Sequence, residues 1–149
     1  MLVFVILNRV GLTQRQALYY SFFYALCTPI FFRTGHLTHN LLSSHFALCS
    51  FALIFLWKKQ EQIYQPMFWS GLCAGTTILI DYSGAPMLLC LAAYAFWVRI
   101  QHAGLAQAIR ELVTFACGAV FPVGLLMFYQ YQSFGNEVMP PQHQMPRPR

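Results

Sequence analysis

Residues 67–98 read MFWSGLCAGTTILIDYSGAPMLLCLAAYAFWV, which is two apolar runs separated by the polar break Asp81-Tyr82-Ser83-Gly84. Similar apolar runs recur along the chain and alternate with short polar loops. This alternation is typical of helices that cross a lipid bilayer, where about 20 apolar residues make one span. The two short runs must be extended by their flanks, tilt little or form a tight hairpin around Asp81.

The whole sequence predicts an all-α fold, a polytopic transmembrane helix bundle with about five spans. Hydrophobic residues make up 58% of the chain and charged residues only 9%, far below the roughly 25% charged of a soluble domain. We expect a transmembrane region over 1–131 and a polar, proline-rich tail over 132–149. The predicted spans lie near 17–32, 41–57, 67–80, 85–98 and 112–131.

The cysteines argue against a disulfide-bonded or metal-binding protein, and the distribution of basic residues argues against a nucleic-acid-binding protein. All five cysteines lie inside apolar runs without a Cys-x-x-Cys pair, so we interpret them as small hydrophobic residues in the membrane. The basic residues are dispersed between the apolar runs and form no continuous patch, so the sequence predicts no nucleic-acid partner.

The distribution of basic residues predicts which side of the membrane each loop occupies. If the loops alternate, one side receives six basic residues and the other three, which favours the first side as cytoplasmic. The first side holds Arg9, Arg15, Lys58, Lys59, Arg99 and Arg110, and the second holds Arg33, Arg147 and Arg149. The segment 33–40, the Asp81 break and the tail then share the outer face. In a bacterial cell the membrane would be the plasma (inner) membrane.

The outer segment carries the candidate ligand-binding residues. Arg33, His36 and His39 form a cluster suited to an anion, because a guanidinium can bind phosphate through paired hydrogen bonds. An equally good interpretation of Arg33 is a helix-end anchor among lipid headgroups. A metal site at His36, His39 and His45 is disfavoured, since no cysteine or carboxylate accompanies them at ligand spacing. We therefore predict no metal and no cofactor.

Three further features carry weaker signals. Asp81 and Tyr82 would face a cavity or substrate if they lay deep in the membrane, but a turn at the outer face is the favoured interpretation. Gly71 and Gly75 form a Gly-x-x-x-Gly pair that predicts close packing against another transmembrane helix. Pro122 predicts a kink in the last span.

Four stretches give the chain a resemblance to a known family in the order of their motifs. These are LVFVILNR at 2–9, CTPIFFRTG at 27–35, GLCAG at 71–75 and YQSFGN at 131–136. In this layout the chain resembles the GT-C glycosyltransferases that use polyprenyl-phosphate sugars, including the dolichyl-phosphate-mannose and aminoarabinose transferase-like proteins. The chain departs from the family at His39-Asn40, where an acidic residue is frequent, and at the Asp81 break, where Arg-Pro is frequent.

The resemblance implies a polyprenyl-phosphate sugar donor at the outer membrane face and an acceptor that enters from that side. It also implies that an acidic residue in the first external loop acts as the catalytic base. That loop would precede the apolar residues 1–7, so we expect this chain to lack it and to be inactive alone. No catalytic residue is therefore assigned within the chain. The expected partners are membrane lipids, other transmembrane helices and the lipid-linked sugar.

Two other functions remain open. The chain could be a non-enzymatic small membrane subunit that packs on a larger complex through its Gly71 and Gly75 face. A transporter fragment is less favoured, because the sequence shows no internal repeat and few polar residues deep within the spans.

Overall fold

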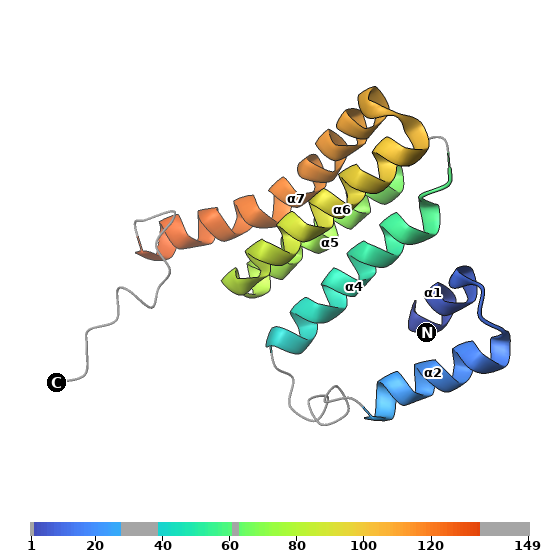
Figure 1. Cartoon of the computed structure of the whole chain (residues 1–149). Helices are drawn as coiled ribbons and strands as arrows, with labels where there is room; N and C mark the ends of the chain where they lie inside the picture. Colours follow the sequence, from blue (N-terminus) through green and yellow to red (C-terminus); the bar gives the residue numbers. More distant parts are fainter. Residues whose placement is uncertain (1, 28–38, 61–62, 135–149) are drawn as a thin grey trace.

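The computed structural model describes residues 2–27, 39–60 and 63–134. Every regular element in these ranges is a helix, which confirms the all-α prediction. Helices α4 to α7 form a bundle, the short α1 contacts α4, and α2 packs against α1 (Figure 1). The elements are α1 (Leu2–Val10), α2 (Gln14–Cys27), α4 (His39–Trp57), α5 (Tyr64–Ile80), the 3₁₀ turn η1 (Tyr82–Gly84), α6 (Ala85–Ala103) and α7 (Leu105–Phe134).

The helices extend beyond the predicted apolar runs into their polar flanks. α5 starts three residues earlier than predicted, α6 continues past Arg99 and α7 starts at Leu105. α7 also includes residues 132–134, which the sequence analysis places in the tail, while 28–32 of the first predicted span lie outside the described residues. Backbone hydrogen bonds form the helix whatever the side chain, so the apolar pattern marks only the part of each helix that avoids water.

One glycine makes the sharp turn between α6 and α7. Gly104 has a φ of 82°, a backbone conformation that residues with a Cβ atom rarely adopt. Its N–H donates to the carbonyl of Ile100 at 3.3 Å, and α7 begins at the next residue. The chain therefore reverses direction with a single residue between two long helices. We call this end of the bundle the Gly104 end and the opposite end the Asp81 end.

Helix α5 lies between α4 and α7 and packs closest of all against α7. A Cβ atom on Gly71 would collide with the carbonyl oxygen of Phe115, and one on Gly118 would collide with that of Phe68. A Cβ atom on Gly75 would lie 2.6 Å from the carbonyl oxygen of Ala119. The two backbones therefore touch, and dispersion contacts along the whole interface hold the pair together.

The opposite face of α5 contacts α4 through buried hydroxyl groups. The Ser50 and Ser70 Oγ atoms lie 2.8 Å apart, and both residues are fully buried. Ser70 Oγ also lies 3.1 Å from the carbonyl oxygen of Ser50. Small hydroxyl residues let helices approach closely and satisfy one another where water is excluded. Glycine on one face and serine on the other make α5 the centre of the bundle.

Much of the outer surface of the helices is apolar. Leu89, Trp97 and Phe121 are each about two-thirds exposed, at 67%, 66% and 68%. By length and composition, α4 and the Leu105–Ser133 part of α7 are each long and apolar enough to cross a membrane. Only 22% of each of these stretches is buried inside the protein. Two of the five predicted spans therefore meet both criteria.

We expect alanine at Gly71 or Gly118 to destabilise the bundle, because the added methyl group has to push two helix backbones apart. Overpacking of this kind costs about 1–3 kcal/mol. The matched control is Gly124→Ala in the same helix as Gly118, since a Cβ atom there meets nothing within 4 Å. Gly124→Ala should be neutral or stabilising by up to about 1 kcal/mol through helix propensity. Thermal unfolding in detergent, followed by circular dichroism, measures all three variants. Equal midpoints for G118A and G124A would contradict the packing described above.

Candidate functional site

The Asp81 end is formed by the tight turn that joins α5 to α6. Asp81 follows α5 in an extended conformation, and its N–H still donates to the carbonyl of Thr77 at 3.0 Å. The N–H of Gly84 then donates to the carbonyl of Asp81 at 2.8 Å. Gly84 is buried so close to Thr77 that a Cβ atom would lie 2.7 Å from its carbonyl oxygen. The turn is thus compact and holds the Asp81 backbone in a defined position.

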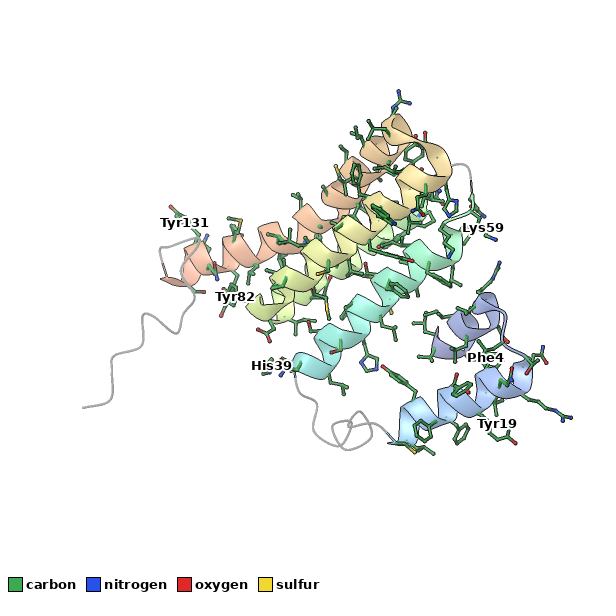
Figure 2. The ribbon with its side chains drawn as sticks, in the orientation of Figure 1. Phe4, Tyr19, His39, Lys59, Tyr82 and Tyr131 are labelled. Carbon is green, nitrogen blue, oxygen red and sulfur yellow. The ribbon has the colours of Figure 1, made fainter. Side chains whose placement is uncertain are left out.

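The first residue of α4 lies against this turn. His39 Nε2 is 3.8 Å from Asp81 Oδ2, which is an ion pair whenever the imidazole is protonated. The His39 side chain is 66% exposed and that of Asp81 is 23% exposed. Figure 2 shows His39 and Tyr82 at the same end of the bundle. The structure therefore brings together two polar elements that the sequence assigns to the outer face.

The other histidines and the arginine considered as ligands do not add to this contact among the described residues. Arg33 and His36 lie outside the described residues. His45 Nδ1 is 2.7 Å from the carbonyl oxygen of Leu41 in its own helix. Among the described residues, no three His, Cys, Asp or Glu side chains come together in a way that could hold a metal ion.

The Gly104 end contains a buried ion pair between α6 and α7. Arg99 and Glu111 are both fully buried, and the guanidinium binds the carboxylate through Nε and Nη2 in a bidentate arrangement. Arg99 Nη1 also donates to the carbonyl oxygens of Lys58 and Gln60, each at 2.9 Å. The single guanidinium thus joins α6, α7 and the segment that leaves α4.

Glu111 accepts further hydrogen bonds from other polar groups at this end. Its Oε1 accepts a hydrogen bond from Gln107 Nε2 at 3.0 Å and from the N–H of Ile63 at 3.4 Å. Gln107 Nε2 lies 3.4 Å from the hydroxyl of Tyr64 at the start of α5. A buried charge is tolerated only when it is paired and hydrogen-bonded, and both charges here satisfy that condition.

The position of Arg99 corrects the sequence analysis. Arg99 was expected among the loop cations that orient the chain, but it lies inside α6 and its charge is compensated by Glu111. The assignment of Arg99 to a loop was wrong because a count of basic residues takes no account of acidic residues that pair with them. A usable signal existed, because charges of opposite sign at 99 and 111 flank a glycine that ends a helix.

The two described carboxylates lie too far apart to act together. Asp81 follows the last residue of α5, whereas Glu111 contacts Ile63, which precedes the first. At a rise of 1.5 Å per residue, the 17 residues of α5 separate the two ends by about 25 Å. Pairs of catalytic carboxylates in glycosidases, for comparison, are within about 10 Å. No acid–base pair is therefore formed by the carboxylates of the described residues.

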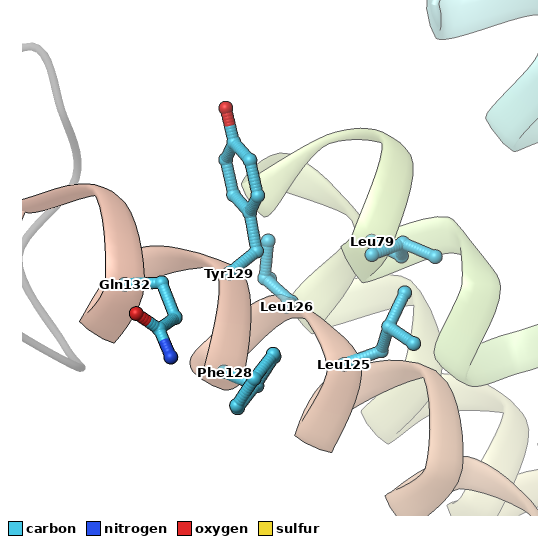
Figure 3. A pocket seen from close by; sticks show the side chains of 6 residues that line it. All are labelled: Leu79, Leu125, Leu126, Phe128, Tyr129 and Gln132. Atoms are coloured by element: carbon cyan, nitrogen blue, oxygen red, sulfur yellow. The ribbon is translucent and has the colours of Figure 1, made fainter.

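Two grooves on α7 are lined mainly by apolar side chains. One of 490 Å³ lies between α5, α6 and α7 and includes Ile78, Leu88 and Val123. The other, of 480 Å³, lies between the last turn of α5 and the end of α7, where Leu79 faces the leucines of α7 while Tyr129 and Gln132 supply its polar atoms (Figure 3). Both grooves suit hydrocarbon and offer few hydrogen bonds to a polar substrate.

No protein-family model, curated protein or solved structure matches this chain. Its class therefore rests on its own geometry. It is an all-α helical bundle with two helices apolar and long enough to span a membrane, one polar pair at one end and one buried ion pair at the other.

Removing either member of the buried ion pair should strongly destabilise the bundle. Arg99→Met or Glu111→Gln leaves the partner charge buried without its counter-charge, which costs about 3–5 kcal/mol. The control is Arg110→Gln, because Arg110 is exposed beside Glu111 and such surface changes stay within about 0.5 kcal/mol. The double variant R99M/E111L should unfold at a higher temperature than either single variant. Single variants as stable as R110Q would show that the pair does not hold this end together.

Proposed function

We propose that this chain is an integral membrane protein with about five spans that forms the membrane-embedded, donor-binding part of a polyprenyl-phosphate-dependent glycosyltransferase. In a bacterial cell it would lie in the plasma (inner) membrane. The proposal has two parts, the membrane placement and the ligand, and each is supported by a separate set of observations.

The exposed apolar surface supports the membrane placement. A core helix of a soluble protein is mostly buried, whereas α4 and α7 are only 22% buried over their apolar stretches. Large exposed apolar side chains such as Leu89 and Phe121 continue this surface over α6 and α7. Soluble monomers rarely expose contiguous apolar patches larger than a few hundred Å². Lipid chains are the solvent that suits this surface.

Helix length supports the higher span count. α4 and α6 have 19 residues each, about 28 Å, and α5 has 17, about 25 Å, close to the roughly 30 Å of a bilayer core. The four bundle helices alternate in direction, so Lys58, Lys59 and Arg110 gather at the Gly104 end while His39 and Asp81 lie at the other. This arrangement agrees with basic residues inside.

The observation that carries the ligand proposal is the contact between His39 and Asp81. It places the start of α4 beside the α5–α6 turn, and Arg33 and His36 precede His39 by a few residues in the sequence. A phosphate there would meet cationic side chains at the membrane surface, while its hydrocarbon tail would remain in lipid. Charge-assisted hydrogen bonds from a guanidinium suit such a phosphate.

The proposed role is donor binding, and transfer by this chain alone is not expected. Sugar transfer needs a base to accept the acceptor proton. Asp81 is the only described carboxylate at the Asp81 end, and it faces His39. Glu111 is about 25 Å away and bound to Arg99. The catalytic base would therefore come from elsewhere.

A non-enzymatic membrane subunit is the second candidate, but the Gly71 and Gly75 face expected to dock it is occupied by α7 of the same chain. The groove between α5, α6 and α7 favours it, because the lining is entirely apolar and a Cβ atom on Gly124 at its wall would meet nothing within 4 Å. A small residue facing open space on a membrane helix is a suitable docking position for another helix.

The membrane placement predicts that lipid reaches the exposed tryptophans. We expect brominated phospholipids to quench the fluorescence of the chain in nanodiscs, because Trp57, Trp69 and Trp97 are all exposed. Trp97→Phe should remove a large share of the quenched signal, since Trp97 is 66% exposed on α6. Unquenched fluorescence in a folded, nanodisc-bound sample would contradict the placement.

The ligand proposal predicts binding of a polyprenyl phosphate in nanodiscs of neutral lipid. Arg33→Ala and His39→Ala should each weaken binding about tenfold or more, since a hydrogen bond to a charged group contributes about 1.5–3 kcal/mol. Arg147→Ala and His45→Ala are the matched controls, with the same residue types elsewhere. Native mass spectrometry of the protein–lipid complex provides the measurement.

The controls separate the two candidates. Binding that is equally weak in R33A and R147A would mean that net charge alone attracts the lipid, and the donor-binding role would fail. No binding by the unmodified chain, with quenching by brominated lipid intact, would leave the membrane subunit as the better account.

A further inference from the structure

Basic residues lie near the buried ion pair at the Gly104 end. We call the set Lys58, Lys59, His102 and Arg110 the basic rim. Lys59, His102 and Arg110 are exposed, and Lys58 is half-buried. They belong to three different helix ends, and Figure 2 shows Lys59 where α4 ends.

Arg99 brings the members of the basic rim together. Its guanidinium contacts the carbonyl oxygen of Lys58 on one side and the carboxylate of Glu111 on the other. Arg110 is the neighbour of Glu111, and His102 lies one helical turn after Arg99. Lys59 and Arg110 therefore lie at the same end of the bundle, although they are separated widely in the sequence.

The acidic residue of this end does not neutralise the rim. Glu111 is fully buried and its oxygens bind Arg99, Gln107 and the N–H of Ile63. Glu61, which follows the two lysines in the sequence, offsets one charge and lies outside the described residues. The rim therefore keeps a net positive charge.

Apolar groups next to the rim favour a ligand that belongs to a membrane. The exposed Trp57 immediately precedes the two lysines, and the Lys58 ammonium lies 4.1 Å from the centre of the Phe55 ring in α4. A lysine that lies along the apolar side of its helix and a tryptophan at the helix end are both typical of the headgroup region. A soluble anion would need the cations but not these neighbours.

We propose that the basic rim binds the headgroup of an anionic phospholipid, with Arg99 and Glu111 acting as positioning residues that hold the rim together. Charge complementarity carries the proposal, and the aromatic neighbours select lipid over a soluble anion. The proposal rests on the membrane placement above and does not depend on the glycosyltransferase role. Each cation near an anionic membrane surface should contribute about fivefold to the affinity.

The test compares the chain in nanodiscs of phosphatidylcholine with increasing fractions of phosphatidylglycerol. Thermal unfolding and retained lipid in native mass spectrometry are both measured. Phosphatidylglycerol should stabilise the unmodified chain, and K59Q/R110Q should lower the affinity for it about 25-fold. The control R147Q/R149Q removes the same charge from the tail. Circular dichroism verifies that both double variants are folded.

Three outcomes would overturn the proposal. Equal losses in the two double variants would mean that net charge alone attracts the lipid. Undiminished binding by K59Q/R110Q would exclude the rim as the site. Stabilisation by millimolar inorganic phosphate, equal to that by phosphatidylglycerol, would identify a soluble anion as the ligand. A failure of brominated-lipid quenching would instead reject the membrane placement itself.

Discussion

The ion pair between Arg99 and Glu111 joins α6 and α7 to the segment that connects α4 with α5. A buried charge without a partner costs far more free energy than the loss of any single apolar contact. The fold therefore has to supply hydrogen-bond partners for both buried charges. Satisfying Arg99 requires the carbonyl oxygens of Lys58 and Gln60, and satisfying Glu111 requires Gln107 and Ile63. The register of α6 against α7 and the path of the chain after α4 follow from these requirements.

In the rest of the bundle, small side chains at the helix contacts, instead of charged groups, determine how the helices pack. α5 packs against α7 at Gly71, Gly75 and Gly118, and against α4 through Ser50 and Ser70. If the bundle lies in lipid, as proposed, apolar association gives helices little advantage over contact with hydrocarbon, and close backbone approach has to supply the attraction. Small residues on two faces of α5 allow this close approach to both of its neighbours. The polar pairs at the two ends of the bundle then fix how far the helices are shifted along one another.

The sequence predicts the helices and turns of this chain better than it predicts which side chains contact one another. The polar break at Asp81 and the two flanking apolar runs predict the α5–α6 turn from local pattern alone. The ends of α6 and α7 are missed, because Arg99 and Glu111 look like loop residues until each is seen to neutralise the other. The contact of His39 with Asp81 joins segments two helices apart, and such proximity is not encoded in spacing. The sequence grouped His39 with Arg33 and His36, of which neither lies among the described residues.

Helix α6 differs mechanically from its neighbours. It is tied near one end by Arg99 and at the other by the compact turn around Gly84, while its first half borders the 490 Å³ apolar groove through Leu88 and Ala92. α5 and α7, by contrast, touch backbone to backbone and cannot separate without losing many contacts at once. Because both ends of α6 are held by contacts, a movement of this helix has to bend it between those ends. Such bending would change the width of the apolar groove and leave the closely packed pair of α5 and α7 undisturbed.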